Sequence, residues 1–180
     1  MSASDPELIA RVLRQDDRAA FGELVQRHQS AVRRFLRHLT RGDAALADDL
    51  AQDTFLSAYR GLARFHGEAG FGTWLFGIAH NHWRNARRRQ RESVPLPDDA
   101  AFEETTPSSV HASDLHHDLS AALTQLDPAE QTALHLFYQQ GLSHPEIAAV
   151  LDCPLGTVKT NIARGKDQLR QLLAVWNPST

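Results

Sequence analysis

The sequence has few of the features that mark secreted, disulfide-bonded or membrane-spanning proteins. Its 180 residues include a single cysteine, Cys153, which excludes a disulfide within the chain. No apolar run approaches the ~20 residues that cross a bilayer, so membrane insertion is not expected. Residues 1–10 contain two acids and no Lys or Arg, and therefore lack the basic start of a signal peptide. These absences predict a cytoplasmic protein with one ordinary domain or two small ones.

Charge is distributed unevenly along the chain, although its net value is only −3. Residues 1–91 hold 15 Lys and Arg against 10 Asp and Glu, whereas residues 92–127 hold eight acids and no Lys or Arg. Residues 128–180 hold four of each sign. A basic block followed by an acidic middle predicts a polyanionic partner for the first block and a different role for the middle.

Apolar residues recur at helical spacing nearly everywhere outside the acidic middle, and no strand pattern stands out. Ser4 and Glu7 form a capping-box pattern that opens a first helix. Asp17 and Asp43 are typical first residues for a second and a third helix, and a fourth is predicted to run from about 71 to 91. The first half of the chain is therefore predicted to be a four-helix domain.

The helical pattern fails between about residues 92 and 112, where prolines, threonines and paired acids are typical of a linker. It returns with leucines at helical spacing from Leu115. The predicted fold is all-α, with two small helical domains joined by a flexible acidic linker. The expected boundaries are 1–91, 92–112 and 113–180.

A helix-turn-helix spanning about Leu142 to Arg170 is the firmest local prediction. Ser143 and Glu146 form a second capping box, and the turn follows at Asp152. The second helix is expected to bury Val158, Ile162 and Leu169. Its predicted exposed residues are Thr157, Lys159, Thr160, Asn161, Arg164 and Lys166.

The exposed residues of that second helix favour DNA as its ligand. A helix in this arrangement fits the major groove, where Lys and Arg pair with guanine or phosphate and Asn pairs with adenine. An ordinary helical hairpin with a solvated polar face is the alternative. Cationic and amide residues gathered on one face argue for DNA binding.

An acidic ridge is predicted on the third helix. Asp48, Asp49, Gln52 and Asp53 fall on one side of it, opposite Leu46, Leu50 and Thr54. Such a ridge suits a basic protein surface and would repel DNA. The alternative is an ordinary solvated helix face.

Residues 65–91 combine aromatic side chains, a glycine-containing loop and an arginine cluster at the end of the segment. Aromatic rings beside a cationic track are typical of sites that hold single-stranded nucleic acid. Phe71 and Trp74 have core spacing, so burial is the alternative for them. The arginines are too dense for a routine ion-paired face and indicate phosphate contact. They are Arg84, Arg87, Arg88, Arg89 and Arg91.

Together these segments resemble the extracytoplasmic-function sigma factors of the sigma-70 family. Residues 48–55 resemble their polymerase-binding segment, and residues 71–89 resemble their melting and minus-ten segment. Residues 126–131 and 142–170 resemble their fourth region, which binds the minus-thirty-five element. The resemblance covers nearly the whole chain in the family's order.

The resemblance implies an RNA polymerase sigma factor that directs transcription initiation, with a role for each segment. Its partners would be core RNA polymerase, bound by Asp48, Asp49, Gln52 and Asp53, and promoter DNA. The linker would occupy the RNA exit path. The minus-ten contacts would come from His66, Gly67, Glu68, Asn81, Arg84, Arg87 and Arg88. The minus-thirty-five contacts would come from Thr157, Lys159, Thr160, Asn161, Arg164 and Lys166.

The loop and three single positions depart from the family pattern. The resemblance implies that the loop captures a flipped minus-ten base. The loop reads Phe-His-Gly-Glu-Ala over residues 65–69, where Phe-Arg-Gly-Asp-Ser is usual, so the identity of that base is not fixed by the resemblance. Asp152 stands where Gly is usual, and Asn161 where Arg is common, so the upstream sequence that is bound can differ. Leu46 replaces a frequent acid of the docking ridge.

A helix-turn-helix transcriptional regulator with a helical sensor domain is the rival hypothesis, but a sensor needs neither the acidic ridge nor the arginine cluster. No nucleophile–base pair or phosphate loop indicates an enzyme, and no cofactor is expected. Because no extension follows Thr180, the family resemblance points to a separate anti-sigma factor as regulator. Cys153 in the turn could be redox-sensitive, although a lone turn cysteine more often fills space. A metal cluster at His111, His116, His117 and Asp118 is a remote alternative to a surface cluster, so no metal site is expected.

Overall fold

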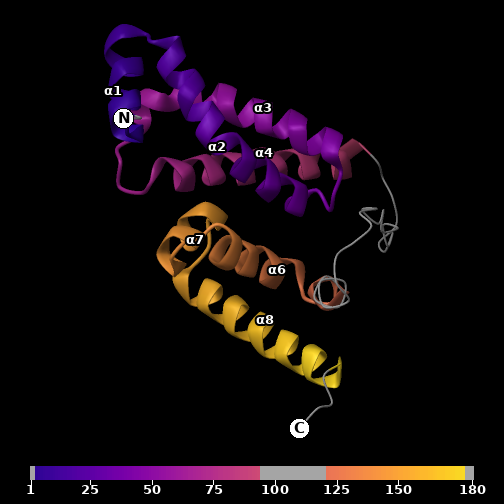
Figure 1. The fold of residues 1–180 in the computed structure, drawn as a ribbon. Coiled ribbons are helices and arrows are strands. Elements are labelled where there is room, and N and C mark those ends of the chain that lie inside the picture. The colour runs from indigo at the N-terminus through magenta and orange to yellow at the C-terminus, as the bar shows by residue number, and fades with distance from the viewer. Residues whose placement is uncertain (1–2, 94–120, 177–180) are drawn as a thin grey trace. The chain divides into compact units, whose positions relative to one another are not determined.

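The computed structural model describes residues 3–93 and 121–176 and forms two compact units, residues 1–104 and 105–180 (Figure 1). The described residues are helices, turns and loops without a strand, which confirms the all-α prediction. The predicted linker from residue 94 onward lies outside the described residues, as do His111, His116, His117 and Asp118. No described helix combines the length and apolar character needed to span a bilayer.

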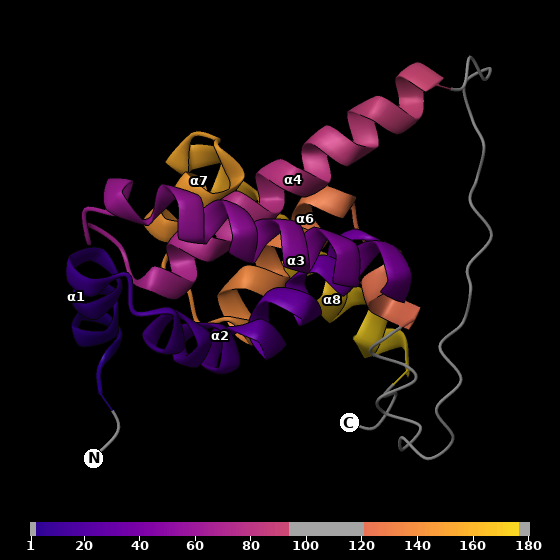
Figure 2. The same ribbon diagram turned by 90° about the horizontal axis from the view of Figure 1, so that it is seen from above.

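The described residues of the first unit form four α-helices and one short 3₁₀ helix. These are α1 (Asp5–Gln15), α2 (Arg18–Leu39), α3 (Ala44–Gly61), η1 (Leu62–Arg64) and α4 (Phe71–Ser93). The long helices α2, α3 and α4 pack against one another, and α1 lies at one end of them, against α2 and η1 (Figures 1 and 2). Helix α4 continues two residues into the segment that was predicted to be linker.

The predicted helix starts of the first unit are confirmed. Ser4 and Glu7 form the capping box of α1, with the Ser4 amide donating to the Glu7 carboxylate over 2.6 Å. Asp17 accepts from the Ala20 amide at the start of α2. Asp43 accepts from the Leu46 amide over 3.0 Å at the start of α3. These side chains satisfy amides that the first turn of each helix leaves without a partner.

The core of the first unit is built from large apolar side chains in each helix, and one polar side chain joins them. Thr54 on α3 is fully buried, and its hydroxyl donates to the Leu50 carbonyl over 2.7 Å, so its polar atom is satisfied. Leu46, expected to lie opposite the ridge, is only half-buried, and so is Phe55. Small side chains at Ala47 and Ala51 take the central positions of α3 instead. The fully buried large side chains are Leu8, Leu24, Val32, Phe35, Leu36, Leu62 and Leu75.

The second unit contains the helix-turn-helix. Its elements are α6 (Pro128–Leu134), the π-helical turn η2 (His135–Gln139), α7 (His144–Leu151) and α8 (Leu155–Trp176). Helix α8 packs on α6 and α7. Asp127 begins α6, and its carboxylate accepts from the Ala129 amide. A full capping box would require it to accept from the Glu130 amide instead.

The turn geometry predicted for the helix-turn-helix is confirmed. The Ser143 amide and hydroxyl both donate to the Glu146 carboxylate, over 2.9 and 2.7 Å, at the start of α7. Asp152 ends α7 in the left-handed conformation, with φ 52° and ψ 51°. Asp tolerates this conformation better than most residues that carry a Cβ, which explains how it can replace glycine here.

The buried face of the second unit differs in part from the prediction. Val158 and Ile162 are buried, as expected, and so is Ile147. Leu169 is only half-buried, as are Ala148 and Leu151, whereas Val150 and Gly165 face the core. The spacing of Val158, Ile162 and Gly165 places them on one stripe of α8, centred slightly away from Leu169.

Candidate polymerase and nucleic-acid interfaces

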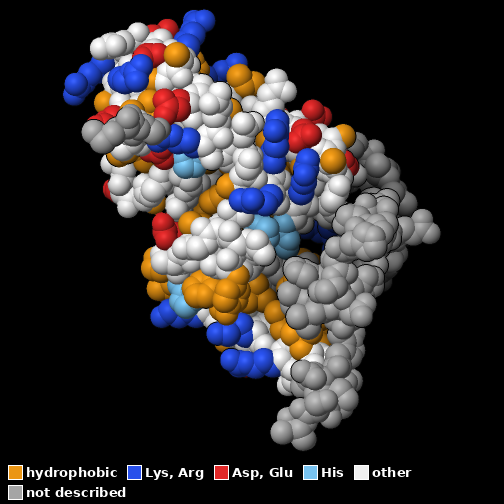
Figure 3. All heavy atoms as spheres, in the orientation of Figure 1, with side chains coloured by type: hydrophobic (Ala, Val, Ile, Leu, Met, Phe, Trp, Pro, Cys, Tyr) orange, Lys and Arg blue, Asp and Glu red, His pale blue; other side chains and the backbone are white. Residues whose placement is uncertain are grey.

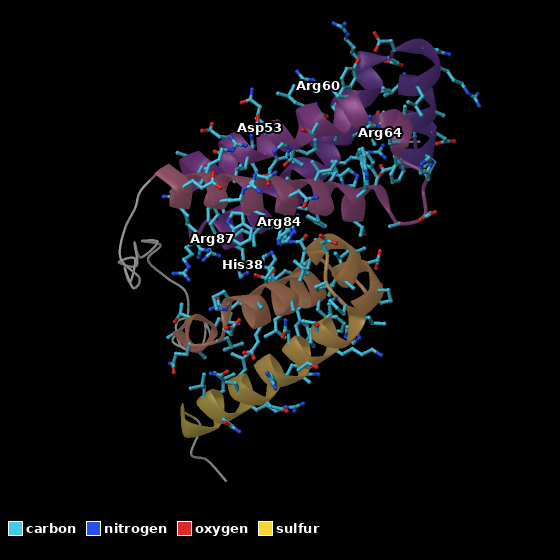
Figure 4. All side chains as sticks on the ribbon, turned by 180° about the vertical axis from the view of Figure 1, so that it is seen from behind. His38, Asp53, Arg60, Arg64, Arg84 and Arg87 are labelled. Atoms are coloured by element: carbon cyan, nitrogen blue, oxygen red, sulfur yellow. The ribbon has the colours of Figure 1, made fainter. Side chains whose placement is uncertain are left out.

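The predicted acidic ridge is an exposed surface of α3. Asp48, Asp49, Gln52 and Asp53 are all exposed, and the opposite face of the helix is buried. Asp53 projects from α3 on one side of the first unit, whereas Arg84 and Arg87 project from α4 on the other (Figure 4). The acidic and basic surfaces of this unit are therefore separated. A partner that binds the acidic surface need not contact the basic surface, and the reverse also holds.

The ridge contains two features that the sequence did not reveal. Arg33 on α2 approaches Asp48, with 3.2 Å between Nε and Oδ1, and both side chains are about half exposed. An exposed pair of this kind contributes about 0–1 kcal/mol, so a partner can displace it. Leu56 is 46% exposed, although it is apolar. Leu56 lies four residues after Gln52 and three residues after Asp53. This helical spacing places Leu56 beside the ridge and is the signal in the sequence that could have identified it.

The glycine-containing loop between η1 and α4 is open to solvent. His66, Gly67 and Glu68 are exposed, and Gly67 adopts a φ of 75° that favours glycine. Its two flanks are packed. The ring centroids of Phe65 and Phe71 lie 5.5 Å apart. An exposed loop tip held at both ends by aromatic contacts can offer its side chains to a ligand in a fixed place.

The aromatic rings around this loop are largely committed to packing. Phe71 is buried, and Trp74 is half-buried with its ring 5.2 Å from Phe65 and 5.6 Å from Phe71. The alternative of burial therefore holds for Phe71 and in part for Trp74. Trp83 is half-buried, and the Arg87 guanidinium lies 5.6 Å from its ring centroid. That cation–π contact orients Arg87 along α4.

The arginine cluster of α4 is exposed as predicted. Asn81, Arg84, Arg87 and Arg88 are all exposed on the second half of the helix. Arg88 has a weak contact with Glu92, at 3.7 Å between Nε and Oε1.

Arg41, at the end of α2, belongs to the same basic surface and was not predicted from the sequence. Partial burial lowers the pKa of Arg87, and repulsion from Arg91 and Arg41 lowers it further. Cations gathered at this density form a surface that suits a polyanion.

The predicted contact residues on the second helix of the helix-turn-helix form two stripes rather than one. Thr157, Thr160 and Arg164 are exposed, and Asn161 is half-buried beside them. At 3.6 residues per turn these four positions share one face of α8. The expectation that the cationic and amide residues gather on one face was wrong, because Lys159 and Lys166 do not share the face of Asn161 and Arg164.

The remaining two predicted contacts lie on a separate stripe. Lys159 is exposed and Lys166 is half-buried, and they are seven residues apart. The Thr160 hydroxyl donates to the Gly156 carbonyl over 2.9 Å, so its oxygen is left to accept a hydrogen bond from a ligand. The predicted contact residues of α8 therefore lie on two distinct faces of the helix.

Hydrophobic side chains are also exposed on the second unit, as the surface view shows (Figure 3). The large ones are Tyr138 at 60% and Leu155 at 40%. The Phe137 ring contacts Tyr138 edge-on at 4.9 Å and stacks on His144 at 5.2 Å. Among the described residues, no group of three or more His, Cys, Asp or Glu side chains is arranged to hold a metal ion.

Two family profiles match the chain in the places where these surfaces lie. The profile described as Sigma-70 region 2 matches residues 24–93, which include the acidic ridge, the loop and the arginine cluster. The profile described as Sigma-70, region 4 matches residues 116–169, which include most of the helix-turn-helix. Together they span more than half of the chain.

Full-length relatives and solved structures agree with the profiles. The chain is 32% identical to the ECF RNA polymerase sigma-E factor of Haemophilus influenzae, over 92% of this chain and 93% of the relative. It is 34% identical to the RNA polymerase sigma-H factor of Pseudomonas aeruginosa, over 94% of this chain and 93% of the relative.

Two solved structures are similar to this chain. The sigma factor RpoE of Bartonella quintana, solved with the anti-sigma factor NepR, gives a TM-score of 0.70 at 28% identity, over 86% of this chain and 97% of its own. CnrH, solved with the cytosolic domain of CnrY, gives a TM-score of 0.65 at 28% identity, over 95% of this chain and 97% of its own. This chain therefore belongs to the extracytoplasmic-function group of RNA polymerase sigma factors in the sigma-70 family.

Proposed function

We propose that this sigma factor binds core RNA polymerase through the acidic ridge of α3 and promoter DNA through two separate surfaces. The observation that carries the proposal is the separation of charge in the first unit, where Asp53 and the pair Arg84 and Arg87 project from opposite sides (Figure 4). We assign polymerase and minus-ten binding to residues 1–91 and minus-thirty-five binding to residues 113–180, with residues 92–112 as the connection.

The polymerase contact would be made by Asp48, Asp49, Gln52 and Asp53. All four are exposed on one face of a helix whose other face is anchored in the core, so they are presented rigidly. Complementary charge raises the association rate and fixes the docking register. Leu56 would add an apolar contact beside this charged surface.

Minus-ten DNA would be bound by the exposed loop and by the second half of α4. His66, Gly67 and Glu68 would surround a base removed from the stack, because the loop tip is open and its flanks are packed. Phosphates would be bound by Asn81, Arg84, Arg87 and Arg88 on α4, which are exposed.

The minus-thirty-five element would be bound by α8 in the major groove. Thr157, Thr160, Asn161 and Arg164 share one face and would meet base edges, whereas Lys159 and Lys166 would contact phosphate. The Asn161 amide can bind adenine, since it can donate to and accept from one base.

The solved relatives bear on regulation. RpoE and CnrH were each solved with a protein partner, the anti-sigma factor NepR and the cytosolic domain of CnrY. We infer that this chain is likewise regulated in trans by an anti-sigma factor and works in the cytoplasm without enzymatic activity of its own. The rival hypothesis of a one-component regulator does not account for the matches to both sigma-70 regions.

The polymerase contact can be tested with a pair of charge-matched variants of the full chain. Asp49→Asn with Asp53→Asn removes two ridge charges without changing side-chain size. Glu92→Gln with Asp167→Asn removes two exposed charges elsewhere, at side chains that are 67% and 66% exposed. Affinity for core polymerase is measured by anisotropy of a fluorescent label.

We expect the ridge variant to bind core polymerase about tenfold or more weakly and the matched variant to bind within about twofold of the wild type. Both variants should melt within a few degrees of the wild type, because all four side chains are exposed. Wild-type affinity in the ridge variant would contradict the docking assignment.

A further inference from the structure

Helix α1 is tied to α2 by the carboxylate of Asp5. Arg27 donates from Nη1 to Asp5 Oδ1 over 3.0 Å, and His28 Nε2 lies 2.7 Å from Asp5 Oδ2. Because an ionised carboxylate only accepts hydrogen bonds, His28 carries a hydrogen on Nε2. The side chains of His28 and Asp5 are 21% and 26% exposed, so the contact is shielded from much of the solvent. Asp5 therefore fixes the direction of the His28 ring.

The other side of the His28 ring faces the start of α4. Its ring centroid lies 5.4 Å from that of Phe71, edge to face. Gly72 is so close that a Cβ placed on it would lie 3.4 Å from His28 Nδ1 and 3.6 Å from Cε1. Phe71 and Gly72 are the first two residues of α4. The imidazole thus occupies the space directly against the first turn of that helix.

The contact continues from Phe71 to the other end of the exposed loop. Phe71, Phe65 and Trp74 form a cluster of three mutually contacting rings, and Phe65 and Phe71 flank residues 66–70. Helix α1 also packs on η1, which immediately precedes Phe65. Helix α1 therefore contacts the element before the loop and, through Asp5 and His28, the element after it.

We propose that α1 is a brace for the base-capturing loop, and that Asp5 and His28 are its positioning residues. The proposal rests on the minus-ten role proposed for residues 66–70. A loop that distinguishes bases must hold its polar groups within a fraction of an ångström, which requires fixed rotamers in the surrounding side chains. The match to Sigma-70 region 2 begins at residue 24, so the family profile includes His28 but neither α1 nor Asp5.

The test measures base selectivity in the assembled holoenzyme. Four fork-junction DNAs differ only in the unpaired minus-ten base, and selectivity is the ratio of the best affinity to the mean of the other three. Asp5→Ala and His28→Ala should each lower this ratio about tenfold, the size of effect that a small misplacement of contacting groups produces. Asp5→Asn should retain most of it, since the amide oxygen can accept from Arg27 while the amide nitrogen donates to Nε2 of the other His28 tautomer.

A matched control separates this brace from general docking of α1. Arg11→Ala removes another ion pair between α1 and the start of α2, in which Arg11 and Asp17 are 2.6 Å apart. That pair does not contact α4, so selectivity should stay within about twofold of the wild type. If Arg11→Ala lowered selectivity as much as Asp5→Ala, the role assigned to the Asp5–His28 contact would be overturned.

Two further outcomes keep this proposal distinct from the minus-ten assignment. Glu68→Ala alters the loop itself, and unchanged selectivity in that variant would remove the capture role on which the proposal rests. A change in Glu68→Ala together with wild-type selectivity in Asp5→Ala and His28→Ala would overturn the brace alone. Melting temperatures show whether each variant is folded, and if Asp5→Ala is not, His28→Ala decides the outcome.

Discussion

Gly165 on α8 lies directly against Leu134 on α6. A Cβ placed on Gly165 would lie 2.8 Å from Leu134 Cδ1 and 3.1 Å from Leu126 Cδ2, both closer than atoms in contact normally approach. Glu130 Cβ would lie 3.3 Å away. The absence of a side chain at Gly165 therefore allows α8 to pack closely against α6.

Gly165→Ala should therefore destabilise the second unit. The added methyl group forces α6 and α8 apart or rotates Leu134, which costs about 1–3 kcal/mol. The higher helix propensity of alanine offsets about 0.5–1 kcal/mol of that cost. Chemical denaturation of the full chain, followed by circular dichroism, measures the net loss.

The same substitution elsewhere on α8 is the control. A Cβ on Gly156 would meet nothing within 4 Å, so Gly156→Ala should leave stability unchanged or raise it by up to about 1 kcal/mol. Equal stability changes at the two positions would show that packing against Leu134 does not limit the approach of α8.

Cys153 is expected to be a poorly reactive thiol. Burial raises the pKa of the Cys153 thiol, and the neighbouring Asp152 carboxylate raises it further. A higher pKa leaves less of the thiolate, which is the form that reacts with alkylating agents and oxidants. At pH 8, iodoacetamide should therefore modify the native protein more slowly than the denatured protein.

Asp152→Asn tests the electrostatic part of this effect. Asn keeps the left-handed backbone of residue 152 but carries no charge, so alkylation should become about two- to fivefold faster. An unchanged rate in this variant would assign the low reactivity to burial alone, and a native rate equal to the denatured one would contradict the raised pKa.

Helix starts and the all-α class could be predicted from sequence because local chemistry fixes them. Ser4, Asp17, Asp43 and Ser143 each satisfy amides within three residues, so the pattern and the structure agree. The exposed acids of α3 followed from helical period alone. Asp152 could also be placed in the turn, because the tolerance of Asp for the left-handed conformation is a local property.

The long-range contacts could not be predicted in this way. Gly165 has no side chain, so a pattern of apolar spacing does not register it as a core position. His28 contacts Asp5, which lies 23 residues away in the sequence. Arg41 joins the basic surface only because α2 and α4 pack together. Such relationships depend on tertiary packing and not on local sequence.

The stability of the first unit should depend on the ionisation of Asp17. The Ala20 amide and the Arg11 side chain hold the pKa of this carboxyl below its ordinary value of 3.8. The folded state therefore binds fewer protons than the unfolded state near that pH. The stabilisation is fully present above the unfolded pKa and is lost as pH falls through the lowered folded value.

Asp17→Asn isolates this contribution, because Asn also caps a helix but does not titrate in this range. Melting temperatures are measured between about pH 6 and pH 3, and the wild type should exceed the variant at the upper end. The difference should shrink as the pH falls below 3.8, because Asp17 then becomes protonated, whereas the other carboxyls titrate in both proteins and cancel. A difference that stays constant across this range would contradict the lowered pKa of Asp17.

The two stripes of α8 predict two different effects on minus-thirty-five DNA binding. Asn161→Ala and Arg164→Ala should each cost about 1–3 kcal/mol for the preferred sequence and relax the choice of base at one position, because these residues lie on the face assigned to base edges. Lys159→Ala and Lys166→Ala should weaken all sequences alike and each reduce the slope of log affinity against log salt by about one. Binding of the full chain to a library of duplexes at several salt concentrations separates the two effects. Loss of base preference in the lysine variants, or uniform weakening in the Asn161 and Arg164 variants, would show that the stripes have been assigned to the wrong parts of the DNA.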